Sequence, residues 1–203
     1  MRKVIVNNIV SVDGFYSAAD GNPLVLNMDA AFDRENLASI EAAGTVLLGR
    51  NSFEGFSQYW PFVADAPAAE DPESPEGRAL DDVNRAISRR YSAVPKVVVS
   101  DQGAVPAENA WHDSTTVIGR SEALDWIAAE RLRGEGDIAI FASRTLWNVL
   151  AQAGVIDELR IMISPDALGV GVPLWDSPMP LELLEARTFE DSGNVQLRYA
   201  PRA

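Results

Sequence analysis

Residues 45–61 read TVLLGRNSFEGFSQYWP, and this stretch contains the main signal for the fold. An apolar run at 46–48 is followed at once by a glycine, a cation and two small polar residues at 49–52. A short apolar run bounded by glycine is typical of a buried strand, and small polar residues after it are typical of a helix start. We therefore predict a buried strand that leads directly into a helix, with the following aromatic residues mostly in the core.

Strands and helices alternate on both sides of this stretch. Apolar periodicity predicts strands at 4–10, 96–100, 115–119, 137–141 and 157–165, and helices at 29–43, 79–90, 121–132 and 143–154. Residues 61–78 are expected to form a loop. Gly44 is expected to end the helix 29–43, and Ser121 is expected to cap the start of the helix 121–132. The central DSGN of residues 181–201 predicts a final hairpin.

This order predicts an α/β fold with a mostly parallel sheet, helices on both faces and antiparallel C-terminal strands at one edge. No linker divides two cores, so residues 1–203 are expected to form a single domain. The chain has no cysteine and one histidine, His112, which excludes thiolate and poly-histidine metal sites. We expect no metal, and we expect His112 to be a surface or packing residue.

The composition narrows the range of partners. The formal net charge is −13, and phosphate backbones need clustered Lys and Arg, so we expect no nucleic-acid partner. No apolar run reaches the roughly 18 residues of a membrane span, so we expect a cytoplasmic protein without a membrane partner. Much of the acid lies in residues 64–82, which are expected to be a solvated loop.

Two strand ends carry the same chemical device. GRNS at 49–52 and ASRT at 142–145 each open a helix directly after a buried strand. A helix N-terminus presents free N–H groups and the positive end of the helix dipole, which favour anions. Two such turns beside one sheet predict a site for a pyrophosphate and a further phosphate. Neither a G-x-G-x-x-G nor a G-K-[ST] fingerprint is present.

The sequence resembles the dihydrofolate reductase superfamily, and most closely the C-terminal reductase domain of the bifunctional riboflavin-biosynthesis deaminase-reductase and its stand-alone relatives. The resemblance covers nearly the whole chain and is carried by SVDGF at 11–15, LLGRNSFEGF at 47–56, KVVVS at 96–100, and DIAIFASRTLWNVLAQAGVIDELRIMISPDALGVGVPLW at 137–175. It implies the three-layer αβα fold of dihydrofolate reductase and hydride transfer from NADPH to a small-molecule substrate.

The resemblance also implies residue roles. The turn at 49–52 would bind cofactor phosphates, with the arginine near the 2′-phosphate, and the segment 142–146 would hold the pyrophosphate. A serine after the third strand and an arginine after the fourth would line the adenosine end, and the first strand would meet the nicotinamide amide. The cofactor-binding residues implied are Ile9, Gly49, Arg50, Asn51, Ser52, Ser100, Arg120, Ala142, Ser143, Arg144, Thr145 and Leu146.

Two aspartates are candidates for the catalytic acid. Dihydrofolate reductases carry a pterin-binding carboxylate sixteen residues before the Gly-Arg, a position that is Asp33 here. Asp13 in the SVDG turn is the other candidate, although a turn-forming role explains it equally well. Asp29, one helical turn before Asp33, is expected in the substrate pocket together with Phe53 and Phe141.

The chain departs from the family pattern at two places. Riboflavin-pathway reductases carry a substrate-binding glutamate where this chain has Phe141, and a phenyl ring accepts no hydrogen bond. The superfamily's Gly-Gly is Ala142-Ser143 here, which is costly if the backbone needs a positive φ. The first departure disfavours the riboflavin-pathway substrate.

We therefore expect an NADPH-dependent reductase of a small, planar heterocycle. The alternatives are a 5-amino-6-(5-phosphoribosylamino)uracil reductase or a dihydrofolate reductase, and a nucleotide- or flavin-binding protein without turnover. The resemblance further implies a homodimer that pairs through the sheet edge near the C-terminal strands. The apolar segments 157–164 and 195–199 suit that interface, although they could equally be plain core.

Overall fold

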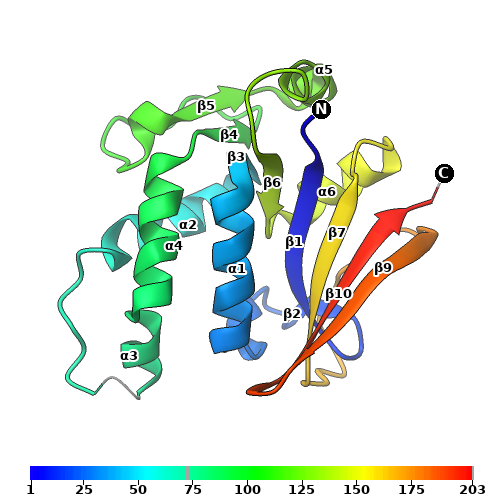
Figure 1. The fold of residues 1–203 in the computed structure, drawn as a ribbon. Coiled ribbons are helices and arrows are strands. Elements are labelled where there is room, and N and C mark those ends of the chain that lie inside the picture. The colour runs from blue at the N-terminus through cyan, green and yellow to red at the C-terminus, as the bar shows by residue number, and fades with distance from the viewer. Residues whose placement is uncertain (72–73, 203) are drawn as a thin grey trace.

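The computed structural model describes residues 1–71 and 74–202, and an eight-stranded sheet forms its centre (Figure 1). The strand order is β5-β4-β3-β6-β1-β7-β10-β9. The strands from β5 to β7 in this order are parallel, whereas β10 runs antiparallel to both β7 and β9. Their bounds are Val4–Ser11 (β1), Ala43–Gly49 (β3), Lys96–Val99 (β4), Thr115–Ile118 (β5), Asp137–Phe141 (β6), Glu158–Ser164 (β7), Leu181–Phe189 (β9) and Ser192–Pro201 (β10).

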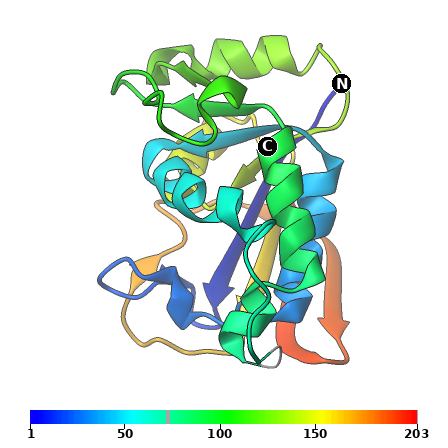
Figure 2. The same ribbon diagram turned by 90° about the vertical axis from the view of Figure 1, so that its left-hand side faces the viewer.

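Helices cover both faces of this sheet and give the predicted three layers (Figure 2). One apolar cluster packs α5 and α6 against one face, and another packs α1, α2 and α4 against the other face. A small sheet of β2 (Phe15–Ser17) and β8 (Val172–Pro173) is separate from the main sheet. The helices are α1 Ala30–Ala42, α2 Arg50–Val63, α3 Pro75–Ala79, α4 Asp82–Ala93, α5 Ala123–Glu130 and α6 Arg144–Gln152, with single 3₁₀ turns η1 Pro23–Val25, η2 His112–Ser114 and η3 Arg120–Glu122.

Several predicted boundaries are wrong, and side-chain caps explain most of them. The predicted loop 61–78 contains the end of α2 and all but the last residue of α3. The helix predicted at 79–90 begins at 82 because the side chain of Asp81 accepts the N–H of Asn84. Ser121 does not cap α5: it lies inside η3, where the Glu122 carboxylate accepts the N–H of Gly119.

Gly44 does not end a helix in a loop as predicted. α1 ends at Ala42 and β3 begins at the next residue, so Gly44 is part of the strand. A Cβ at this position would lie 1.9 Å from the carbonyl oxygen of Glu135. The glycine is therefore required by the close approach of the loop before β6, which no local signal in the sequence indicates.

The two segments suggested for a dimer interface do not lie at the edge of the sheet. Residues 157–164 and 195–199 lie in β7 and β10, which are both interior strands. The edge strand next to β10 is β9, in which Leu183 and Leu184 are 54% and 49% exposed, and β5 forms the opposite edge. The segments expected at a dimer interface are thus part of the sheet interior, and the exposed edge is β9.

The described part of the chain contains neither a membrane-spanning helix nor a cluster of metal ligands. None of its helices is long and apolar enough to cross a membrane. Residues 1–71 and 74–202 also contain no group of three or more His, Cys, Asp or Glu arranged to hold a metal ion. The acidic segment 64–82 is described except for residues 72 and 73.

Candidate functional site

The helices α2 and α6 begin at neighbouring points at the carboxyl ends of the parallel strands. α2 follows β3 and α6 follows β6, and these two strands are hydrogen-bonded neighbours. The connections that follow these two helices run in opposite directions across the sheet. The chain after α2 continues to β4, next to β3, and the chain after α6 continues to β7, on the far side of β1. In open α/β sheets, ligands bind in the crevice at such a switch point, outside the carboxyl ends of the strands.

Two hydrogen bonds tie the predicted phosphate turns to each other. The N–H of Gly49 donates to Oγ of Ser143 at 3.0 Å, and the N–H of Ser143 donates to Oγ of Ser52 at 3.0 Å. These residues lie 91 to 94 positions apart in sequence. The structure therefore brings together the two turns that the sequence paired only by their similar composition.

Both helix starts lack a side-chain cap. Asp29, Ser74 and Asp81 cap α1, α3 and α4, whereas α2 and α6 have no such hydrogen bond among the described residues. Asn51 and Thr145 in their first turns are exposed, while Leu146 packs against the core. First-turn N–H groups have no partner within their own helix, so both starts are suited to hold an anion.

The turn between β6 and α6 is held in an unfavourable backbone conformation. Ala142 and Ser143 have φ values of 49° and 50°, in the left-handed region that glycine adopts readily. This conformation costs an alanine or serine about 1 kcal/mol or more. The departure from the family's Gly-Gly is therefore costly here, and the surrounding hydrogen bonds of Ser143 maintain it.

β1 extends past its neighbour β6 and leaves part of its backbone open. Its pairing with β6 ends at Asn7, while its pairing with β7 continues to Ser11. The side chain of Asn8 donates to the carbonyl of Ala142 at 3.3 Å beside this gap. Ile9 lies in the one-sided segment, and its own side chain is buried with Leu26 and Met162. The main chain at Ile9 therefore pairs with β7 on one side and, among the described residues, with no strand on the other.

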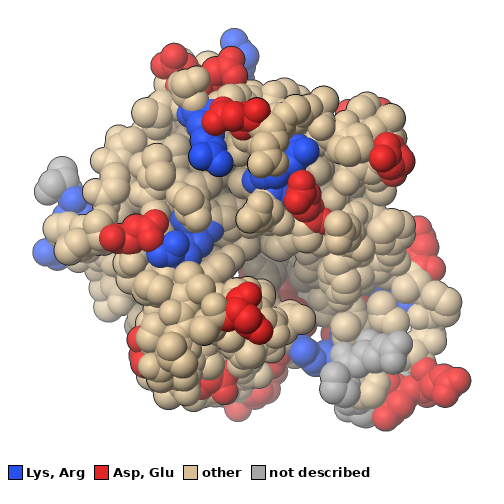
Figure 3. All heavy atoms as spheres, turned by 180° about the vertical axis from the view of Figure 1, so that it is seen from behind, with Lys and Arg blue, Asp and Glu red and all other residues tan. Residues whose placement is uncertain are grey.

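Each arginine expected at the cofactor is paired with a carboxylate. Arg50 donates to Glu54 at 2.8 Å, Arg120 lies 3.6 Å from Asp101, and Arg144 pairs with Asp176 and with the carbonyl of Pro173. The face opposite to that of Figure 1 is hollowed near its middle, and basic and acidic side chains lie next to each other around the hollow (Figure 3). Through its contacts with Asp176 and the carbonyl of Pro173, the guanidinium of Arg144 joins α6 to β8 and to the loop after it.

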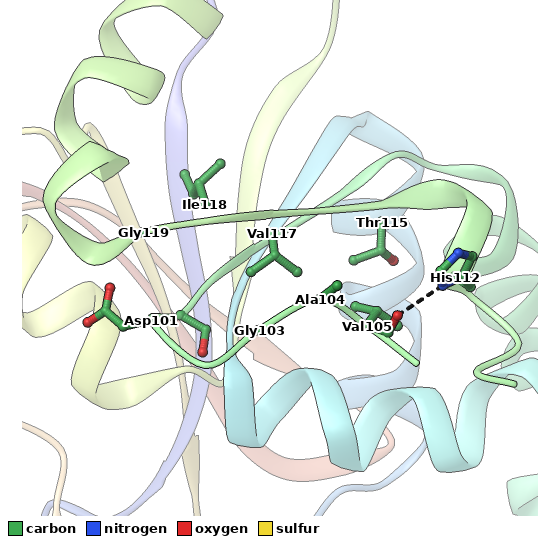
Figure 4. Close-up of a pocket in the computed structure, with 10 residues that line it drawn as sticks. Asp101, Gly103, Ala104, Val105, His112, Thr115, Val117, Ile118 and Gly119 are labelled. Atoms are coloured by element: carbon green, nitrogen blue, oxygen red, sulfur yellow. Dashed lines mark hydrogen bonds between the residues drawn. The ribbon is translucent and has the colours of Figure 1, made fainter. Parts of the chain in front are cut away.

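A pocket of about 570 Å³ lies beside the strand β5. The loop after β4 forms one wall, and the side chains of Thr115 and Val117 point toward it from β5 (Figure 4). Ser100 and Asp101 lie at one end and His112 at the other, where its Nδ1 is 3.0 Å from the carbonyl of Val105. Of these residues, Ser100 was predicted from the sequence and Asp101 was not, although its position directly after a buried strand is a usable signal.

A hydrogen bond connects this pocket to the start of α2. The guanidinium of Arg50 donates to the carbonyl of Gly103, a pocket residue, at 3.3 Å. Ser100 is buried, and its Oγ accepts the N–H of Gln102 at 3.0 Å, which shapes the loop. The pocket, the two helix starts and the open backbone of β1 therefore all lie at the carboxyl ends of the parallel strands.

Asp33 is buried, not solvated, although it lies in the first turn of α1. Its Oδ2 accepts hydrogen bonds from Arg78 and Asn84, both at 3.1 Å. Burial raises the pKa of Asp33 to about 6, against the lowering effect of Asn84 and Arg78. Arg78 also donates to the carbonyl of Met28, whose side chain packs against the cluster around Ile9. A carboxylic acid with this pKa is able to donate a proton near neutral pH.

Asp13 is in a very different environment. It accepts the hydroxyl of Ser11 at 2.6 Å and the backbone N–H groups of Gly169 and Leu168 at 2.7 and 3.1 Å. The bond from Ser11, followed by the one from Gly169, lowers the pKa of Asp13. This carboxylate connects two loops, and of the two candidate aspartates it is Asp33 whose pKa is raised.

Asp29 also has a structural function. It caps α1 and accepts hydrogen bonds from Asn27 and from Ser192 and Asn194 of β10. Burial raises the pKa of Asp29, but these hydrogen bonds, with Ser192 the strongest, outweigh burial and hold its pKa below the usual value. Asp29 therefore fixes the last hairpin to the start of α1.

The two phenylalanines of the expected substrate pocket lie in the core. Phe53 is 1% exposed and packs near Trp111. Phe141 is 3% exposed, and its ring meets Tyr91 edge-on with the centroids 5.4 Å apart. Neither ring presents a broad face to a ligand, so stacking of a substrate on Phe141 is not supported by this arrangement.

Comparison with known proteins gives a consistent result. A family model described as the RibD C-terminal domain matches residues 2–197. The uncharacterized protein YyaP of Bacillus subtilis (strain 168) is 26% identical over 98% of this chain and 94% of its own length. A solved putative riboflavin biosynthesis protein from Shewanella sp. PV-4 has a TM-score of 0.67 at 20% identity, with 99% of both chains covered.

A dihydrofolate reductase also shares the fold. The enzyme from Enterococcus faecalis, solved as a complex with NADP(H), has a TM-score of 0.58 at 15% identity and covers 99% of this chain and 97% of its own. The likeness to both solved structures confirms the dihydrofolate reductase-like architecture expected from the sequence. Because the family model extends over nearly the whole chain, the protein belongs to the RibD C-terminal domain family.

Proposed function

We propose that the protein is an NADPH-dependent reductase of a small, planar heterocyclic substrate. The observation that carries this proposal is the pair of uncapped helix starts, α2 and α6, which Ser143 holds side by side at the carboxyl edge of the sheet. Two such starts suit the linked phosphates of a dinucleotide. The related architecture of a dihydrofolate reductase solved with NADP(H) supports this choice of ligand.

The residues at this edge fit the parts of the cofactor. The first turns of α2 and α6 would hold the phosphates, the main chain of Ile9 the nicotinamide amide, and the pocket beside β5 the adenosine. Arg50 and Arg120 would provide positive charge near the 2′-phosphate. Bound NADPH would supply the hydride, so the protein itself must bind, orient and protonate the substrate.

We assign the proton to Asp33. Its carboxyl group is buried, receives two hydrogen bonds and has a pKa of about 6. Arg78 and Asn84 hold Oδ2, which leaves Oδ1 as the atom that would carry and transfer the proton. A group that titrates near the working pH is well suited to this role.

Binding of the two nicotinamide cofactors tests the cofactor assignment. Titration calorimetry is expected to show that wild-type protein binds NADPH more tightly than NADH. Arg50→Ala should weaken NADPH by about 1.5–3 kcal/mol, the range for a charged hydrogen bond, and leave NADH nearly unchanged. Equal affinity of the wild type for both cofactors would argue against the role of Arg50, and binding of neither would refute the proposed function.

Membership of the RibD C-terminal domain family favours a second candidate, reduction of 5-amino-6-(5-phosphoribosylamino)uracil. Phe141 opposes it, because the position where the resemblance implies a substrate-binding glutamate carries a buried phenyl ring here. Each unpaired hydroxyl of the sugar would cost about 1–3 kcal/mol. We expect little NADPH oxidation with the ribosylaminopyrimidine; kcat/KM above about 10⁴ M⁻¹s⁻¹ would establish the second candidate instead.

Cofactor binding without oxidation by any pterin or aminopyrimidine would indicate a binding protein without turnover.

A further inference from the structure

One end of the pocket beside β5 carries more negative charge than positive. Oδ1 of Asp101 accepts the backbone N–H of Arg120 at 2.9 Å, and its Oδ2 lies 3.6 Å from Nε of the same residue. Oε2 of Glu122 accepts the N–H of Gly119 at 2.6 Å. A Cβ at Gly119 would lie 2.9 Å from Glu122 and 3.6 Å from Asp101, so both carboxylates approach the same residue. The guanidinium of Arg120 is thus accompanied by the carboxylates of Asp101 and Glu122.

We infer that Asp101 limits the preference of the proposed reductase for NADPH, because its carboxylate opposes a 2′-phosphate and accepts a free ribose 2′-hydroxyl. The inference rests on the proposed function, which places the adenosine end of the cofactor in this pocket. The guanidinium of Arg120 lies close to this carboxylate, with 3.6 Å between its Nε and Oδ2 of Asp101, so the positive charge that it offers to a phosphate is partly neutralised. An acidic residue that accepts the 2′-hydroxyl is the device by which other dinucleotide-binding folds select the non-phosphorylated cofactor.

The Asp101–Arg120 pair is able to rearrange when a ligand binds. The side chains of Arg120 and Asp101 are 78% and 63% exposed, and exposed ion pairs are weak. A 2′-phosphate is therefore able to displace the carboxylate from the guanidinium. The displaced carboxylate nevertheless stays at this pocket, since Asp101 follows directly on Ser100 and both residues line it. Arg50 favours NADPH, and Asp101 reduces that preference.

The variant Asp101→Asn tests this role with little disturbance of the fold. An asparagine keeps the oxygen that accepts the N–H of Arg120 and removes only the charge. The dissociation constants of NADPH and NADH are measured by calorimetry at one low ionic strength. We expect NADPH to bind about 5–10-fold more tightly to the variant, the effect of removing one like charge near the phosphate. NADH should bind equally or a few-fold more weakly, so the ratio of the two affinities rises.

Asp176→Asn is the matched control, because it removes a carboxylate from the Arg144 pair at the pyrophosphate end, which both cofactors share. It should change both affinities by the same factor and leave their ratio unaltered. An unchanged ratio in Asp101→Asn, with both cofactors still bound, would overturn this inference alone. Binding of neither cofactor to the wild type would overturn both the proposed function and this inference.

Discussion

At the scale of single residues, Asp33 shows how burial changes the chemistry of a common surface residue. The sequence marks it only as an acid in the first turn of a helix. In the structure, its side chain is 11% exposed and meets Arg78 of α3 and Asn84 of α4. Burial raises its pKa from 3.8 to about 6 because the charged form loses solvation that the two partners only partly replace.

This raised pKa predicts a pH dependence of stability. Between pH 3.8 and 6 the folded protein binds more protons at Asp33 than the unfolded chain does. The stability from this group is therefore fully present below pH 3.8 and is lost as the pH rises through about 6. Between pH 4.5 and 7.5, the free energy of unfolding of Asp33→Asn should rise by about 2 kcal/mol relative to wild type.

Urea unfolding of both proteins at the two pH values measures this difference, and other titrating groups cancel between them. A constant difference would show that Asp33 has an ordinary pKa. In the proposed reaction, kcat of the wild type should also fall as the pH rises through about 6, because the proton donor becomes ionised. The variant should lack that step.

At the scale of elements, the turn between β6 and α6 combines backbone strain with a binding geometry. Ala142 and Ser143 both adopt positive φ, and Ser143 bonds to Gly49 and Ser52 across the gap between the two helix starts. Strained backbone persists where the surrounding contacts determine it, and such positions cluster at functional sites. The hydroxyl of Ser143 accepts the N–H of Gly49, which a glycine could not do, whereas the methyl group of Ala142 forms no hydrogen bond.

Ala142→Gly should therefore stabilise the protein. Relief of the left-handed conformation gains about 1–2 kcal/mol, and the greater freedom of glycine in the unfolded chain costs about 0.4–1 kcal/mol. The expected net gain is about 0.5–1 kcal/mol in the free energy of unfolding. Ala128→Gly is the control, since Ala128 is exposed within α5 and the same exchange there should cost about 1 kcal/mol. Equal losses in the two variants in urea unfolding would contradict the assignment of strain.

At the scale of the whole molecule, the edge strand β9 is the most exposed part of the sheet. Residues 182–188 are all exposed, including Leu183 and Leu184, whose side chains point to opposite faces because neighbouring residues alternate along a strand. Long exposed edge strands invite pairing with another chain. We propose that β9 lies in the interface of a homodimer, in place of the interior segments expected from the sequence.

Light scattering at micromolar concentration should then give twice the chain mass of 22.0 kDa. The interface should bury more than about 1,000 Å². Leu184→Asp should shift the protein toward the monomer, because a charge would be buried in the interface. Leu124→Asp is the control: Leu124 is 44% exposed on α5, away from β9, and the change should leave the mass unaltered. A monomer mass for the wild type would exclude the dimer.

The sequence by itself determined the layers, the order of the elements and the two strand-to-helix turns at 49–52 and 142–145. These features depend on apolar periodicity and on small residues after a strand, which are local properties that survive in almost any packing. The boundaries that failed did so where a side-chain cap or a close backbone approach intervened. Asp81 set the start of α4, and the approach of Glu135 required glycine at position 44.

Only the tertiary structure decided which partner each polar side chain meets. Arg144, expected at a phosphate, is held by Asp176, and Asp33 is buried by Arg78 and Asn84 from 45 and 51 residues away. The position of Asp101 beside Arg120 is equally a result of the pairing of β4 with β5. The physical reason is that burial and ion pairing depend on distances between residues far apart in the chain. Those distances are fixed when the layers pack, and no local periodicity encodes them.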